Sequence, residues 1–159
     1  MPTISEMYPI PPEVKKLHVF LGDWSVEGII KTGGSVMKLE GKWDFSKAAG
    51  GWGLKSANRF EVEGMGVYEL DNLFGFDKET GKLHIYSITN MAETHDHIAS
   101  WSDENTLKGE YDGLKDGKKF REDFTIKLVS PQEFTIDYVE KVNDQIDSTM
   151  NLRLKKQEG

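Results

Sequence analysis

Two histidines stand two positions apart in the stretch His95-Asp96-His97. On a β-strand, residues two apart point to the same face, so both imidazoles would meet the same surroundings. Two imidazoles on one face can share a metal ion or a polar ligand. A metal ion needs at least a third ligand, and we therefore assign neither a metal site nor a cofactor from the sequence.

A hairpin with a symmetric turn at 92–93 is predicted around these histidines, with Asn90 opposite His95. The face of the hairpin that carries both histidines is too polar for a dry core and too aromatic for an ordinary solvated surface. Three interpretations stay open: a pocket wall, a solvent-facing or mouth-lining surface, and a metal site. The residues predicted on this face are His84, Tyr86, Asn90, His95, His97 and Trp101.

Glu122 interrupts the apolar face that Phe120, Phe124 and Ile126 form. A buried carboxylate must be paired, hydrogen-bonded or protonated. In a barrel lumen it would fix a ligand hydroxyl, or act as a general acid or base with a raised pKa. The alternative is a position near the strand end, where the carboxylate reaches water.

Three further residues are candidates for a pocket wall: Trp43, Asn58 and Phe60. Asn58 shares the apolar parity of Phe60, so its amide either donates to a ligand or is satisfied within the structure. Trp43 lies on the apolar face of an earlier segment, where it either stacks on a planar ligand or belongs to the core.

The elements that would position these residues follow a period of two. After Gly22, apolar and charged residues alternate, which is typical of half-buried strands. Gly33-Gly34 is a two-residue hairpin signal between the first two strands. About ten such segments, joined by short turns, predict an all-β, antiparallel, up-and-down lipocalin-like β-barrel. A two-sheet sandwich is the alternative architecture.

The N-terminal part differs from the rest. Pro2, Pro9 and Pro11 indicate an irregular lead-in over residues 1–11. From Pro12 the apolar spacing predicts a short helix that ends near Gly22 and lies across one barrel mouth. Residues 12–159 are predicted to form a single domain.

Composition excludes several function classes. The 159-residue chain has no cysteine, which rules out disulfides and thiolate chemistry. Its formal net charge of −7 argues against nucleic acid and anionic membranes as partners. No apolar run approaches the roughly 20 residues of a membrane span. No secretory signal is visible, and we expect a soluble, cytoplasmic protein; a homodimer is possible.

Several short motifs resemble the DUF1579 family, a largely uncharacterised bacterial group with a lipocalin-like, calycin-type barrel. The similarity runs roughly from Leu17 to Leu154, and it implies the same fold without implying a chemistry. The motifs are Leu21-Gly22-Asp23-Trp24, Gly50-Gly51-Trp52, Phe74-Gly75-Phe76-Asp77 and Thr94-His95.

Three functions are compatible with these features. The leading hypothesis is a non-catalytic protein that holds a small apolar or amphipathic molecule in its lumen. A second is an isomerase, cyclase or lyase that uses Glu122 with His95 or His97. A third, by analogy with nitrobindin-like barrels, is haem binding through one of the two histidines. The predicted pocket residues are Trp43, Asn58, Phe60, Tyr86, His95, His97 and Glu122.

Overall fold

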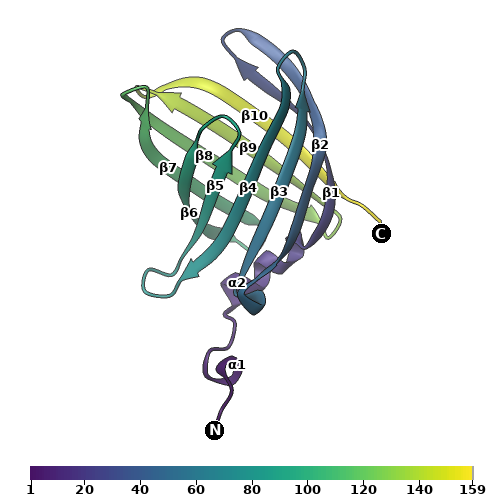
Figure 1. Ribbon diagram of the computed structural model, residues 1–159, viewed down its shortest axis with the longest axis vertical. Coiled ribbons are helices and arrows are strands. Elements are labelled where there is room, and N and C mark those ends of the chain that lie inside the picture. The colour runs from purple at the N-terminus through teal and green to yellow at the C-terminus, as the bar shows by residue number, and fades with distance from the viewer. Residues whose placement is uncertain (159) are drawn as a thin grey trace.

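Ten antiparallel strands close into one barrel in the computed structural model, which describes residues 1–158 (Figure 1). Neighbouring strands pair along the chain, and β1 pairs with β10 to complete the ring. Closure gives each strand a partner on both sides. The predicted up-and-down barrel is confirmed, and the sandwich alternative is wrong. The strands are β1 (Gly22–Thr32), β2 (Ser35–Ala48), β3 (Gly53–Val62), β4 (Gly66–Asp77), β5 (Lys82–Thr89), β6 (Thr94–Asp103), β7 (Thr106–Lys115), β8 (Lys118–Ser130), β9 (Glu133–Val142) and β10 (Gln145–Lys156).

The alternation of residue types places one face of each strand in the lumen. β3 is the most regular case: Leu54, Phe60 and Val62 are buried, whereas Lys55 and Arg59 between them face solvent. Side chains from all ten strands meet inside the barrel and form its core. Burying this apolar surface is the main force that stabilises the closed sheet.

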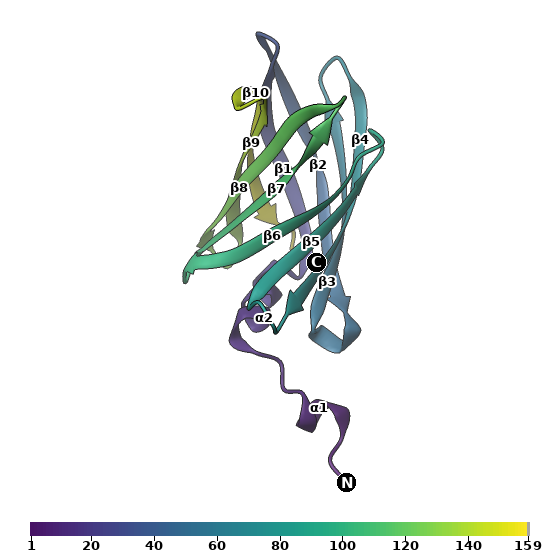
Figure 2. The same ribbon diagram turned by 90° about the vertical axis from the view of Figure 1, so that its left-hand side faces the viewer.

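A helical segment closes one end of the barrel (Figure 2). It consists of α2 (Pro12–Leu17) and a 3-10 turn (His18–Phe20). Phe20 stacks on Phe45 with ring centroids 5.7 Å apart, and its carbonyl accepts a 2.7 Å hydrogen bond from Nε1 of Trp24. The helix therefore occupies the predicted position across a mouth, and its aromatic contacts seal that end.

Residues 1–11 are less irregular than predicted, because they include the one-turn helix α1 (Ile4–Met7). The Thr3 hydroxyl accepts from the backbone N–H of Glu6, and the Glu6 carboxylate accepts from the Thr3 N–H. No residue of α1 is buried, and the helix stands clear of the barrel in Figure 2. None of the helices that the structure describes has the length and apolar character of a membrane crossing.

The β5–β6 hairpin differs from the prediction in its register. The backbone N–H of Thr89 donates to the Glu93 carbonyl at 3.0 Å, which closes a turn over residues 90–92. Ser87 therefore lies opposite His95, three residues before the predicted partner. An odd shift of register turns the side chains of one strand to the other face of the sheet.

The shift moves two predicted pocket-face residues to the outer wall. Tyr86 is 46% exposed, so its predicted place in the lumen is wrong. His84 also points outward, where its Nδ1 lies 3.1 Å from Asp96 on β6. Asn90 has a structural role, because its amide pairs with the backbone of β4.

Candidate functional site

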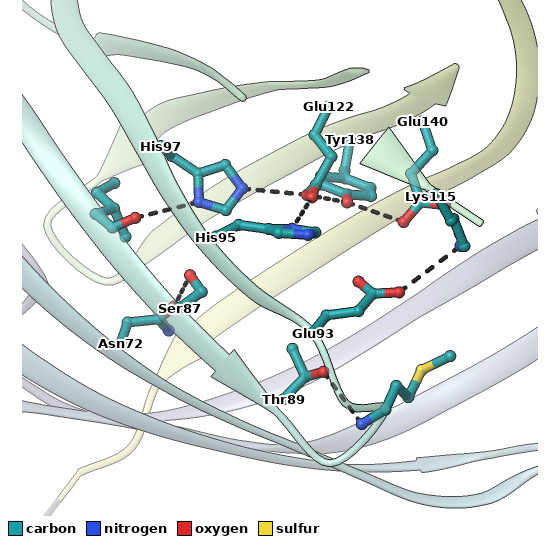
Figure 3. A network of polar contacts seen from close by, with 12 residues as sticks. Asn72, Ser87, Thr89, Glu93, His95, His97, Lys115, Glu122, Tyr138 and Glu140 are labelled. Atoms are coloured by element: carbon teal, nitrogen blue, oxygen red, sulfur yellow. Dashed lines mark hydrogen bonds and ion pairs between the residues drawn. The ribbon is translucent and has the colours of Figure 1, made fainter. Parts of the chain in front are cut away.

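An internal cavity of about 510 Å³ runs from the aromatic core toward the barrel end opposite α2. Its two sides differ in chemistry. Strands β2–β4 supply aromatic rings, among them Trp43, Phe60 and Phe74. The strands across the barrel, β6–β9, supply polar and charged groups together with the turn before β6. These groups are Glu93, His95, His97, Lys115, Glu122, Tyr138 and Glu140 (Figure 3).

Glu122 is the centre of the polar side. Only 3% of the residue is exposed. Its Oε2 lies 3.1 Å from Nε2 of His97 and accepts a hydrogen bond from the Tyr138 hydroxyl, while its Oε1 contacts Nδ1 of His95. Three side chains from β6 and β9 thus converge on one carboxylate of β8, as Figure 3 shows.

The ring of His97 lies between two acceptors. Its Nδ1 is 3.2 Å from the Ile85 carbonyl, so this nitrogen carries a hydrogen. Its Nε2 faces the carboxylate of Glu122, which accepts as well. The contact between Nε2 and Glu122 therefore needs one hydrogen, on the nitrogen or on the carboxyl group, or a cation between them.

Burial and hydrogen bonding act in opposite directions on Glu122. Burial raises the pKa of this carboxyl, but the hydrogen bonds and charges of His97, Tyr138 and His95 together outweigh it. The pKa of Glu122 is therefore lowered, so the carboxylate is ionised at neutral pH. The raised pKa expected from its position on an apolar face is wrong, because the sequence did not reveal these partners.

Tyr138 links Glu122 to a second carboxyl group. Its hydroxyl lies 3.0 Å from Glu140 and also bonds Glu122, yet it has one hydrogen to donate. Burial is the main cause that raises the pKa of Glu140, which favours a proton on that carboxyl. The single hydroxyl hydrogen of Tyr138 is therefore shared between Glu122 and Glu140. Burial and both carboxylates raise the pKa of Tyr138, so its hydroxyl keeps its proton.

His95 is held between an aromatic ring and Glu122. Its imidazole stacks on Tyr111 of β7, with ring centroids 4.0 Å apart and planes 16° apart. Gly113 makes room for this arrangement, because a side chain there would collide with the Tyr111 hydroxyl. The stacking restricts the ring, and its Nδ1 is in contact with Oε1 of Glu122.

The opposite wall carries polar atoms that have no partner. Trp43 stacks on Phe45 at 5.2 Å and meets Phe60 edge-on at 6.3 Å. Its Nε1 and both amide atoms of Asn58 are buried without a hydrogen bond to any described residue. Asn72, also on this side, contrasts with them because Ser56 and Ser87 satisfy its amide. Buried polar groups normally have partners, so the three unpaired atoms need an explanation.

The structure places most of the predicted pocket residues along the cavity. Trp43, Asn58, Phe60, His95, His97 and Glu122 line it, and Tyr86 does not. Sequence reasoning missed Tyr138 and Glu140, which line the same space. Both share the inward parity of Ile136 on β9. A polar residue at an apolar parity was the signal that identified Glu122, and it would have identified these two.

Comparisons with known proteins identify the fold. No family model and no curated protein matches the chain, so the relation to DUF1579 stays a prediction. Among solved structures, Rv2717c from M. tuberculosis has a TM-score of 0.74 at 14% identity, over 94% of this chain and 99% of that one. The S-type phycobiliprotein lyase CPES from Guillardia theta has a TM-score of 0.66 at 9% identity, over 99% of each chain. At these identities the similarity shows a shared lipocalin-like barrel and nothing more specific.

Replacing His97 tests whether the buried cluster contributes to folding. His97→Ala leaves the Glu122 carboxylate buried and without one of its partners, so the free energy of unfolding falls by about 3 kcal/mol. The matched control is His84→Ala, which breaks an exposed contact with Asp96 and costs at most about 1 kcal/mol. Urea denaturation followed by tryptophan fluorescence measures both. Equal losses in the two variants would contradict the described pairing.

Proposed function

We propose that the protein binds one small amphipathic molecule inside its barrel. The supporting observation is a cavity of about 510 Å³ with an aromatic wall on one side and a buried charged cluster on the other. Ligand pockets commonly have about 300–1,000 Å³, a mostly apolar lining and a few polar groups that fix orientation. The apolar body of the ligand would lie on the rings of Trp43 and Phe60. Its polar part would face Glu122 and the histidines.

The unpaired atoms of Trp43 and Asn58 indicate what the ligand offers. A buried polar group without a partner costs about 1–3 kcal/mol, and a ligand that pairs with it recovers that free energy. Trp43 has one donor to satisfy, and Asn58 has a donor and an acceptor. A small rotation of these side chains toward the cavity would satisfy them on a molecule that carries both an acceptor and a donor. A purely apolar ligand would leave them unpaired.

Haem binding through a single neutral histidine receives less support. Both nitrogens of His97 already face acceptors, and one nitrogen of His95 faces Glu122. An axial bond from His97 would need one of these contacts to break, which leaves Nε2 of His95 as the nitrogen that could face an iron. The haem hypothesis stays a prediction.

Filling the lumen tests the binding proposal. Ile30 and Ile29 are neighbours on β1, and Ile30 lines the cavity whereas Ile29 is exposed. We expect the apolar fluorescent probe anilinonaphthalene sulfonate to bind the native protein and the Ile29→Trp variant alike. Ile30→Trp inserts an indole into the cavity and lowers probe affinity by about tenfold, which corresponds to about 1.4 kcal/mol.

Both variants are first compared by near-ultraviolet circular dichroism, because partly folded proteins also bind this probe. If the folded native protein does not bind the probe, or if the two variants lose affinity equally, the lumen is not the binding site and the proposal is overturned.

A second candidate function is an enzyme that moves a proton on a lumen-bound substrate. The observation that favours it is the contact of Glu122 with both histidines, since groups on opposite walls would have excluded the scheme. Glu122 faces Nδ1 of His95, so Nε2 is the nitrogen left to take a proton from a substrate. A carboxylate in this position orients the ring and stabilises the imidazolium that forms.

The Kemp elimination of nitrobenzisoxazole tests this second candidate, because a base removes its ring C–H proton while the N–O bond breaks to give a coloured phenolate. In buffer with chelator, we expect the native protein to accelerate the reaction, and His95→Ala to lower kcat/KM by about 100-fold. His84→Ala on the outer wall should leave the rate unchanged. Equal rates for the native protein and His95→Ala would contradict a lumenal base at this position.

A further inference from the structure

The folded barrel supplies the third ligand that the His95-Asp96-His97 stretch lacks. His95, His97 and Glu122 each direct one potential ligand atom into the same space, and these atoms all lie within 4.8 Å of one another. The three residues come from β6 and β8, which pair with opposite edges of β7, so the pairing of these three strands brings them together. All three side chains are at least 88% buried, which distinguishes them from a cluster on the surface.

We propose that His95, His97 and Glu122 bind a divalent transition-metal ion of the zinc class. Two imidazoles and one carboxylate suit Zn²⁺, and three protein ligands leave a fourth position open, as in catalytic zinc sites. That position faces the cavity, because all three residues line it. The inference goes beyond organic ligand binding, since the metal site needs no second molecule to form.

The surroundings hold these ligands in a suitable orientation. The Ile85 carbonyl fixes the hydrogen of His97 on Nδ1, which leaves Nε2 as the coordinating atom. Hydrogen bonds of this kind from the outer ring nitrogen to a carbonyl are the usual support of metal-bound histidines. The Tyr138 hydroxyl donates to Glu122 in the same way. His97 and Glu122 therefore each have a partner that sets their orientation.

A cation also resolves the local electrostatics. Nε2 of His97 faces an acceptor, and a metal ion takes the place of the proton that this contact otherwise requires. Tyr138 joins Glu140 to Glu122, and Lys115 lies 3.8 Å from Glu140 and 3.7 Å from Glu93. Binding of a divalent cation adds positive charge where carboxylates gather, and it releases protons from the ligands.

The present geometry requires only small shifts to reach coordination. Ligand bonds of about 2.0–2.2 Å in a tetrahedral zinc site place the ligand atoms about 3.3 Å from one another. The donor atoms already lie within 4.8 Å, and one pair is in direct contact. The largest separation therefore has to shrink by at most about 1.5 Å, from 4.8 Å to about 3.3 Å.

Cobalt binding tests the site, because Co²⁺ in a tetrahedral protein site absorbs visible light strongly. The full chain, without an affinity tag and stripped with chelator, is titrated with Co²⁺. We expect a one-to-one endpoint and loss of the absorption when Zn²⁺ is added. His95→Ala and Glu122→Gln should each weaken Co²⁺ binding by about 100-fold or more, since even residues outside the ligand shell change metal affinity by about 10–100-fold.

His84→Ala is the matched control, because it removes an outer-wall histidine that also faces a carboxylate. We expect it to bind Co²⁺ like the native protein. Circular dichroism shows whether each variant folds. If His95→Ala does not fold, the Glu122→Gln variant provides the test. Absence of a tetrahedral cobalt spectrum, or equal spectra from the native protein and a folded Glu122→Gln variant, overturns the metal site.

Probe binding separates this proposal from the function proposed above. Cobalt binding without binding of anilinonaphthalene sulfonate would support the metal site and contradict the proposed binding of an organic ligand. Probe binding without a cobalt spectrum would do the reverse.

Discussion

The burial of Glu122 is the constraint on which the site depends. A carboxylate in a low-dielectric interior is stable only when donors or cations surround it. Here two histidines from β6 and one tyrosine from β9 surround it. These strands belong to the consecutive run β6–β9, so the cluster exists only when that run pairs in the observed register. The same pairing keeps the carboxylate ionised, although burial alone would favour its protonation.

The architecture gives this cluster access to one end of the lumen. α2 and the stacked rings of Phe20 and Phe45 seal the opposite end. The aromatic wall of β2–β4 then faces the charged groups of β6–β9 across a cavity. Binding of an amphipathic ligand, transfer of a proton and binding of a metal ion all require a polar wall that is protected from bulk water. All three proposals use Glu122 and its contacts with the histidines.

The sequence predicted which side chains of most strands face the lumen, but not the contacts that these side chains make there. Strict alternation identified the inward parity of β3 and β8, and with it Asn58 and Glu122. It could not predict the β5–β6 register, because the turn length depends on a backbone conformation at Ala92, whose φ is 60°. That single shift moved Tyr86 to the outside. The pKa of Glu122 was equally inaccessible, since its direction depends on partners from other strands.

Histidine side-chain nuclear magnetic resonance tests most directly whether Glu122 joins the two histidines. Ring nitrogen signals would be compared between the ¹⁵N-labelled native protein and its Glu122→Gln variant. We predict that the signals of His95 and His97 move, whereas those of His84 and His18, which pair elsewhere, stay in place. Unchanged His95 and His97 signals in the folded variant would contradict the convergence on Glu122 and every function assigned to it.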